Sequence, residues 1–226
     1  KSLVLKNSLS HISFIMDGNN RWSKKNNISK KKAYERGANN LIKLSNYLFK
    51  NYDVRYISAF ALSTNNLKRS ANKIKLLIKI LSNFLDQIDS YKKLDYKIEL
   101  RGNINFLDKS LINKIHNFHQ INLKKEKSLI IFINYGGRED IINGLRKINL
   151  NKVDTNNFKD SLCTYDLPDP EILIRSGGYQ RLSNFMLYEL SFTELFFSKT
   201  LWPDFNTKNI IAIIEKYKKV RRKFGY

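Results

Sequence analysis

The stretch HISFIMDGNNRW, residues 11–22, is the most informative segment of this sequence. Four of the five residues from Ile12 to Met16 are apolar, which is typical of a buried β-strand. The run ends at Asp17 and Gly18, and polar and basic residues follow. An Asp-Gly pair also suits a hairpin turn, but a long basic loop leads from this one into a helical pattern instead of a returning strand. The stretch therefore predicts a strand whose carboxyl end presents one carboxylate among cations.

Short β-rich runs alternate with longer segments of helical periodicity along the rest of the chain. The predicted strands are Ile12–Met16, Val54–Phe60, Tyr96–Arg101, Leu129–Asn134 and Ile172–Arg175, with a weaker sixth around Leu195–Phe197. The predicted helices are Ala33–Asn51, Lys73–Tyr91, a segment capped by Asp108 that runs to about Lys124, Glu139–Ile148 and Thr207–Arg222. This alternation predicts an α/β fold, with a mostly parallel central sheet of about six strands flanked by helices, and residues 1–226 are interpreted as a single domain.

The charge of the chain is strongly positive, with a formal net charge of +21 over 226 residues. Such a charge is typical of proteins that bind nucleic acid or anionic membranes. Lysine outnumbers arginine by 30 to 11, however, and there are 27 asparagines, a bias that AT-rich codons also produce. No single-strand-binding motif is recognisable, so we expect no nucleic-acid partner. The GxxxxGK[ST] and GxGxxG patterns of nucleotide-binding enzymes are also missing.

The few cysteine and histidine residues carry little functional signal. Cys163 is the single cysteine, which excludes an internal disulfide, fits a reducing compartment and is interpreted as an inert, half-buried thiol. His116 and His119 have no partner ligands at metal-site spacing and are interpreted as solvated side chains on a helix. With no apolar run of membrane-spanning length and no signal-peptide pattern, the sequence predicts a cytoplasmic protein.

Polar segments follow the carboxyl ends of the predicted strands, where ligands bind in open α/β sheets. The carboxylate of Asp17 suits a divalent cation, and the backbone amides of Gly18–Arg21 suit a phosphate group. Arg175 and Arg181, with a glycine pair between them and Ser183 beyond, suit a second phosphate clamp, although a surface turn would have the same composition.

Three other segments have two interpretations each. The glycines of Tyr135–Arg138 fit either a further phosphate contact or a strand-to-helix turn without a ligand. Ser63–Arg69 fits either a mobile loop that carries hydroxyl and amide groups and a terminal cation, or a disordered surface loop. The predicted helix Lys73–Tyr91 has an apolar stripe wider than contact with one sheet needs. That stripe fits either a thick core or an internal groove for an aliphatic chain.

Taken together, these segments resemble the cis-prenyltransferases, specifically bacterial undecaprenyl diphosphate synthase. The matching stretches, in the family's order and spacing, are HISFIMDGNNRW, the loop ending NNLKR, NYGGRED, ILIRSGG followed by RLSNF, and ELFFSKTLWPDF. The resemblance implies a Mg²⁺-dependent enzyme that condenses an allylic diphosphate, typically farnesyl diphosphate, with successive isopentenyl diphosphates. The implied product is a long-chain polyprenyl diphosphate such as undecaprenyl diphosphate, the lipid carrier precursor for cell-wall synthesis. A homodimer, a hydrophobic tunnel and peripheral contact with the inner face of the membrane for product release are also implied.

The resemblance further implies roles for individual positions. Asp17 matches the essential metal-binding acid, and Glu194 matches a second one that acts within the chain or across the dimer. Asn66 matches a position credited with accepting a proton, but an amide is better suited to positioning a diphosphate oxygen or a water. The positions implied to bind substrate are Gly18, Asn19, Asn20, Arg21 and Trp22 in the allylic-substrate loop, Lys30, Tyr34, Ser63, Thr64, Asn65, Leu67 and Arg69 elsewhere, and Arg175, Arg181, Leu182 and Ser183 in the isopentenyl diphosphate clamp.

Several positions depart from the family pattern. The departures are Lys30 for arginine, Tyr34 for histidine, Leu67 for tryptophan, Lys73 for an acid, Asn103 for aspartate and Gln180 for histidine. They bear on fine substrate affinity, because lysine, for example, keeps the charge of arginine but loses its planar fork. Asp17 and both clamp arginines are retained, which argues against a non-catalytic partner subunit.

Overall fold

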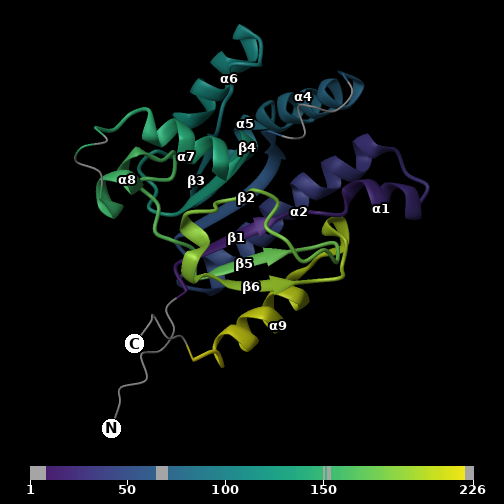
Figure 1. The fold of residues 1–226 in the computed structure, drawn as a ribbon. Helices are drawn as coiled ribbons and strands as arrows, with labels where there is room; N and C mark the ends of the chain where they lie inside the picture. The colour runs from purple at the N-terminus through teal and green to yellow at the C-terminus, as the bar shows by residue number, and fades with distance from the viewer. Residues whose placement is uncertain (1–8, 65–70, 150, 152–153, 222–226) are drawn as a thin grey trace.

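A computed structural model of the chain describes residues 9–64, 71–149, 151 and 154–221 (Figure 1). Its described strands form one sheet in the order β3-β4-β2-β1-β5-β6, with every neighbouring pair parallel. The strands are β1 (His11–Ile15), β2 (Tyr56–Ser63), β3 (Lys97–Arg101), β4 (Ser128–Tyr135), β5 (Ile172–Arg175) and β6 (Glu194–Phe197). The prediction of an α/β fold with about six strands is confirmed, including the weaker sixth strand.

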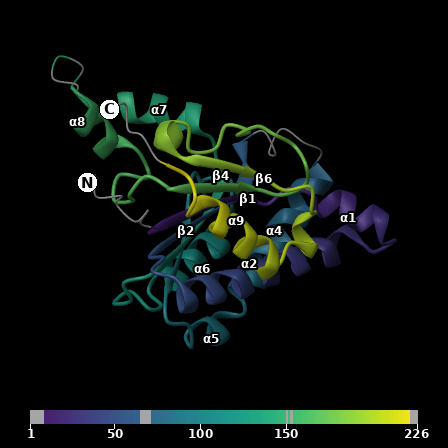
Figure 2. The same cartoon turned by 90° about the horizontal axis from the view of Figure 1, so that it is seen from below.

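Helices cover both faces of the sheet, with α2, α6 and α9 on one side and α7 and α8 on the other (Figure 2). The described helices are α1 (Asn19–Lys25), α2 (Lys30–Asn51), α4 (Ala71–Leu85), α5 (Ile88–Tyr91), α6 (Lys109–His119), α7 (Gly137–Leu145), α8 (Thr155–Ser161) and α9 (Thr207–Tyr217), with 3₁₀ turns η2 (Glu189–Phe192) and η3 (Trp202–Asp204). None of the helices in these described ranges is long and apolar enough to cross a membrane.

Several details of the helix prediction were wrong, among them the end of the helix capped by Asp108, which stops at His119 instead of about Lys124. The segment after Gly18 begins with helix α1 instead of a loop, and α8 was not predicted. The predicted helix Lys73–Tyr91 is divided into α4 and α5, and the C-terminal helix ends at Tyr217. The predicted end of that last helix, Arg222, lies outside the described residues. The N-cap was correct, because the Asp108 side chain accepts a hydrogen bond from the Leu111 N–H at 2.8 Å.

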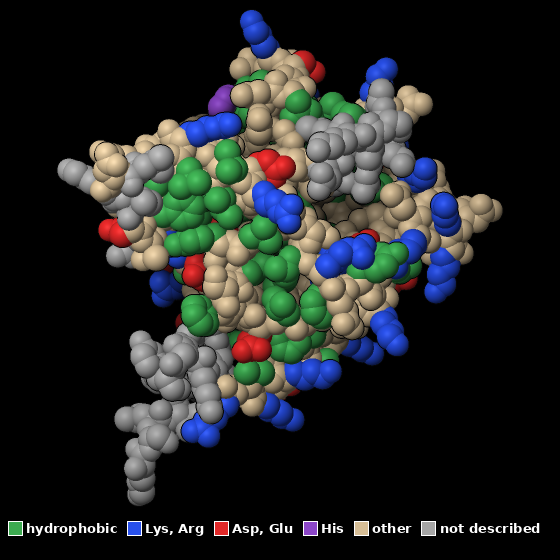
Figure 3. All heavy atoms as spheres, viewed as in Figure 1, with side chains coloured by type: hydrophobic (Ala, Val, Ile, Leu, Met, Phe, Trp, Pro, Cys, Tyr) green, Lys and Arg blue, Asp and Glu red, His purple; other side chains and the backbone are tan. Residues whose placement is uncertain are grey.

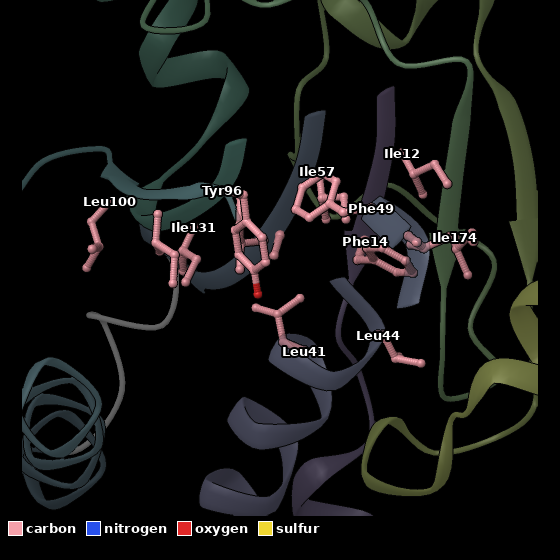
Figure 4. Close-up of a cluster of buried hydrophobic side chains, with 14 of the residues drawn as sticks. Ile12, Phe14, Leu41, Leu44, Phe49, Ile57, Tyr96, Leu100, Ile131 and Ile174 are labelled. Atoms are coloured by element: carbon pink, nitrogen blue, oxygen red, sulfur yellow. The ribbon is translucent and has the colours of Figure 1, made fainter. Parts of the chain in front are cut away.

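Two hydrophobic cores lie on the two faces of the sheet because successive strand side chains point in opposite directions. Ile12 and Phe14 of β1 belong to the larger core, which also contains Leu41 and Leu44 of α2. Figure 4 shows side chains from α2 beside those from the strands in this core. On the other face, Ile15 packs in the smaller core with residues from the segment that follows β5. Burial of both faces explains the continuous apolar runs of the strands.

His11 is fully buried at the start of β1 and bridges two other segments. Its Nδ1 lies 2.6 Å from the Pro168 carbonyl oxygen, and its Nε2 lies 2.7 Å from the Ser58 hydroxyl. Burial lowers the pKa of His11 from its usual 6.5 to about 4. The folded state therefore holds this ring neutral at pH values where the unfolded chain takes up a proton.

This buried histidine predicts a loss of stability in mild acid. The contribution of the neutral His11 ring to the free energy of unfolding is complete above pH 6.5, and it is lost as the pH falls from 6.5 to about 4. The loss is about 3 kcal/mol, because each pKa unit corresponds to about 1.4 kcal/mol. Urea unfolding of wild type and His11→Asn at several pH values would measure it. The variant should be less stable at pH 7 but lose less stability between pH 6.5 and 4, whereas equal slopes would refute the assignment.

The other histidine and cysteine predictions have mixed outcomes. Cys163 is partly buried, so the half-buried interpretation is confirmed. Its Sγ lies 3.2 Å from Asp140 Oδ2, and burial raises the pKa of its thiol, which favours an inert side chain; the inertness itself stays a prediction. His116 is exposed, as predicted. His119 is not a solvated side chain, because its Nε2 accepts a hydrogen bond from the Leu100 N–H at 2.9 Å and burial lowers its pKa. The helical pattern alone did not reveal this contact with β3.

Candidate functional site

The carboxyl ends of three neighbouring strands bring the predicted site residues together. β1 lies between β2 and β5, and Ile15 at the end of β1 is paired with both Phe60 and Arg175. Asp17 therefore emerges next to Arg175 on one side and close to the end of β2 on the other. This is the edge at which an open parallel sheet binds ligands.

The backbone around Asp17 is held firmly in place. Gly18 has φ of 117°, a conformation that favours glycine, and α1 begins at the next residue, which rules out the hairpin alternative. The Asp17 carbonyl oxygen accepts hydrogen bonds from the Trp202 N–H at 3.0 Å and from the Ser176 hydroxyl at 2.8 Å. A Cβ atom at Gly18 would lie only 2.9 Å from a side-chain carbon of Leu201. The chain thus fixes where the carboxylate points.

The Asp17 carboxylate joins two arginines from different segments. Oδ1 accepts from Arg21 of α1 at 3.2 Å, and Oδ2 accepts from Arg175 at 2.8 Å. The Arg175 side chain is only 4% exposed and also donates to the Ser183 hydroxyl at 2.7 Å and to the Arg181 carbonyl oxygen. These bonds connect the first predicted phosphate loop to the second predicted clamp.

Tyr179 is a member of this site to which the sequence alone gave no role. Its ring centroid lies 4.7 Å from the guanidinium carbon of Arg21, 5.8 Å from that of Arg175 and 4.1 Å from that of Arg181. We call Arg21, Arg175 and Arg181 the arginine cluster. An aromatic residue between the two arginines of the RSGGYQR stretch is the sequence signal that could have found it.

A deep pocket extends from this charged group into the larger core. Its volume is about 690 Å³, within the usual range for ligand sites. Asp17 and the arginine cluster lie at its polar end, and a hollow bordered by Lys and Arg side chains is visible on this face in Figure 3. The apolar part is lined by Leu77, Ile78, Ile80, Leu81 and Phe84 of α4, Ala38 and Leu41 of α2, and Ile131 and Ile133 of β4. The wide stripe of α4 therefore lines a cavity in addition to contacting the core.

The pocket gathers ten of the predicted site residues. They are Asp17, Gly18, Asn19, Asn20, Arg21, Tyr34, Ser63, Arg175, Arg181 and Ser183. Asn65, Asn66, Leu67 and Arg69 lie outside the described residues.

The remaining predicted residues lie beside the pocket or away from it. Trp22 is buried, with the Arg36 guanidinium 5.0 Å from its ring, and Lys30 is exposed at the start of α2. Thr64 donates to Glu139 Oε1 at 3.3 Å, and Leu182 packs on the smaller core. A contact of any of these four with substrate stays a prediction.

Glu194 lies away from Asp17 within the single chain. It is paired with Ile172 at the start of β5, whereas Asp17 lies near Arg175 at the end of that strand. The separation along the strand is about 10 Å for three residues. In the part of the chain that the structure describes, no three His, Cys, Asp or Glu side chains form a metal-binding group. A metal role for Glu194 across a dimer stays a prediction.

Comparison with known proteins identifies the protein family to which this chain belongs. Residues 15–225 match the protein family described as "Putative undecaprenyl diphosphate synthase". The isoprenyl transferase of Rickettsia typhi is 36% identical over 223 residues, covering 96% of this chain and 98% of the relative. Dehydrodolichyl diphosphate synthase 4 of Arabidopsis thaliana is 34% identical, over 95% of this chain and 78% of the relative.

Solved structures give the same result. Lavandulyl diphosphate synthase from Lavandula x intermedia, crystallised with dimethylallyl diphosphate, has a TM-score of 0.87 and 28% identity, over 96% of this chain and 98% of that one. A probable undecaprenyl diphosphate synthase from Campylobacter jejuni has a TM-score of 0.79 and 26% identity, over 97% and 100% of the two chains. The chain is a prenyltransferase that belongs to the undecaprenyl diphosphate synthase family of cis-prenyltransferases.

Proposed function

We propose that this prenyltransferase condenses an allylic diphosphate, with farnesyl diphosphate as the expected primer, with successive isopentenyl diphosphates to form a long polyprenyl diphosphate. The observation that carries the proposal is one pocket with two different ends. Its mouth holds the arginine cluster around Asp17, which suits diphosphate groups, and its interior is apolar, which suits a hydrocarbon chain. Undecaprenyl diphosphate, a carrier precursor for cell-wall synthesis, is the product we expect.

The reaction is an electrophilic alkylation. The allylic carbon–oxygen bond breaks, diphosphate departs with the electron pair, and the terminal alkene carbon of isopentenyl diphosphate bonds to the allylic carbon. A proton is then lost from the new chain. We expect Arg21, beside Asp17, to neutralise the departing diphosphate, and Arg175 with Arg181 and Ser183 to hold the isopentenyl diphosphate.

The donor set at the pocket mouth fits a magnesium ion that the substrate helps to hold. Asp17 is the acid at the mouth among the described residues, and its side chain is 28% exposed. Magnesium is commonly bound by one or two carboxylates together with phosphate oxygens and water. Asp17 would therefore hold the ion with the allylic diphosphate. When bound, Mg²⁺ would supply positive charge to the leaving group.

A homodimer with peripheral membrane contact is part of the proposal. Phe192, Leu195 and Phe197 are 61%, 43% and 37% exposed on or beside β6, the edge strand of the sheet. An exposed group of large apolar side chains is typical of a protein or membrane contact. We expect this edge to pair two copies of the chain in the cytoplasm, and the long product to leave toward the membrane.

One assay tests the proposal. The purified chain would be incubated with labelled isopentenyl diphosphate, Mg²⁺ and either farnesyl or dimethylallyl diphosphate, and the products separated by chain length. We expect farnesyl diphosphate to prime a long product and EDTA to stop its formation. No incorporation with either primer would contradict prenyl transfer, and a single ten-carbon product from dimethylallyl diphosphate would contradict chain elongation.

Narrowing the apolar part of the pocket should shorten the product. Ala38 of α2 lines the pocket, so Ala38→Leu would add bulk where the growing chain is held. Each five-carbon unit gains about 4 kcal/mol from burial, at roughly 0.8 kcal/mol per carbon, and a filled cavity removes this gain for the last units. We expect products shorter by one or more units, measured by the same chain-length separation. Ala212→Leu, at an exposed position of α9, is the matched control. Unchanged product lengths for both variants would contradict the placement of the growing prenyl chain in this pocket.

A further inference from the structure

Tyr179 is the residue of the pocket mouth for which neither the sequence motifs nor the proposed reaction supplies a function. The residue is 44% exposed and lines the pocket. The ring contacts arginines that reach it from three places: Arg21 from α1, Arg175 from the end of β5 and Arg181 from the loop beyond it.

The backbone sets the position of this ring. Gly177 and Gly178 both have φ of 85°, and their N–H groups donate to Thr200 and Ser198 carbonyl oxygens at 2.8 Å. A Cβ atom at Gly177 would lie 2.6 Å from a guanidinium nitrogen of Arg21. The glycine pair therefore lets the chain pass close to Arg21 and places the next side chain over the cluster.

The charges of the cluster are incompletely balanced by carboxylates. Asp17 is shared between Arg21 and Arg175, and no acidic side chain in the described ranges forms an ion pair with Arg181. Arg181 has the shortest of the three contacts with the Tyr179 ring, at 4.1 Å. The electron-rich face of the ring is thus the shared partner of three cations that would otherwise repel one another.

We propose that Tyr179 is a positioning residue whose ring holds Arg21 and Arg181 together, so that one aromatic face organises both diphosphate subsites. This inference rests on the proposed function, in which Arg21 serves the allylic diphosphate and Arg181 the isopentenyl diphosphate. A guanidinium can stack on a ring by its flat face while its N–H edge still donates to phosphate oxygens. The ring therefore pre-orders the two side chains without occupying the donors that the substrates need.

The test compares the ring with its aliphatic and aromatic replacements. Tyr179→Leu removes the π face, Tyr179→Phe keeps it, and Tyr165→Leu, at a tyrosine that is 59% exposed outside the pocket, is the matched control. We expect Tyr179→Leu to raise KM for both diphosphate substrates about tenfold, with kcat changed less than about threefold. Tyr179→Phe should keep both KM values within about threefold of wild type, because its ring retains the cation–π contact. Unchanged thermal unfolding midpoints would show that the variants are folded.

Binding of inorganic pyrophosphate by calorimetry gives a readout that does not depend on turnover. Tyr179→Leu should bind it about tenfold more weakly than wild type, and Tyr179→Phe and Tyr165→Leu should bind it normally. Wild-type affinity in Tyr179→Leu would overturn the inference, as would tighter binding, equal damage in Tyr179→Phe, or an effect on the KM of one substrate alone. The wild type and its variants could show the expected pyrophosphate affinities while the wild type transfers no prenyl group. That result would refute the proposed function but leave the role of the Tyr179 ring in anion binding standing.

Discussion

Replacement of Asp17 by alanine is expected to lower kcat/KM for prenyl transfer about 10³-fold or more, equivalent to about 4 kcal/mol of transition-state stabilisation. The carboxylate is the group at the pocket mouth that would hold Mg²⁺ against the leaving diphosphate, and it also orients Arg21 and Arg175. Both functions are lost together in the variant. Incorporation of labelled isopentenyl diphosphate under single-turnover conditions measures the loss without a contribution from product release.

Two companion variants separate this chemistry from a loss of fold. Asp17→Asn keeps the shape of the side chain and one acceptor for Arg175, so it should remain folded and still lose most of the activity. Asp53→Ala removes an exposed carboxylate just before β2, at the amino ends of the strands, whereas Asp17 lies at their carboxyl ends. This variant should retain ordinary activity. Ordinary turnover in both Asp17 variants would mean that the diphosphate leaves without this carboxylate.

The second large effect is expected from Arg175→Lys, with kcat/KM reduced about 100-fold. Arg175 is buried and uses its fork to contact Asp17, Ser183 and the Arg181 carbonyl oxygen together. A lysine keeps the charge but cannot make these bonds in the same geometry. Steady-state kinetics should show the loss mainly as a higher KM for isopentenyl diphosphate.

A surface arginine provides the control for that substitution. Arg146→Lys changes an exposed side chain at the end of α7, where its partner is Asn143 at 3.3 Å, and should leave the kinetics unaltered. If Arg175→Lys behaved like Arg146→Lys, the set of bonds from the Arg175 guanidinium at the pocket mouth would have no part in substrate binding.

The strands and the order of the elements were predictable because their signal is local. β1, β2, β4 and β5 are buried on both faces, so each appears in the sequence as a short apolar run that ends at polar residues. The carboxyl ends of these runs also indicated where Asp17 and Arg175 would meet, since neighbouring parallel strands end at the same edge.

The missed helices are those that lack an apolar stripe. α1 has the sequence NNRWSKK, in which Trp22 is the one large apolar side chain, and its start is set by the backbone contacts of Gly18. The break between α4 and α5 was missed for the opposite reason. Ile88 continues the apolar stripe beyond Leu85, so the periodicity contains no sign of the interruption.

Contacts between distant segments account for the remaining differences between the sequence-based predictions and the structure. The position of the Tyr179 ring among three guanidinium groups depends on how α1 meets the loop after β5, which no local pattern encodes. The contact of His119 with the Leu100 N–H has the same origin. The sequence predicted a solvated side chain for His119 and no role for Tyr179.

The most direct test is a crystal structure of the chain with Mg²⁺, isopentenyl diphosphate and a non-cleavable farnesyl diphosphate analogue. The predicted result has both diphosphates within hydrogen-bonding distance of the arginine cluster and the farnesyl chain against Leu77, Leu81 and Phe84. Diphosphates bound elsewhere, with the crevice beside Asp17 empty, would contradict the account.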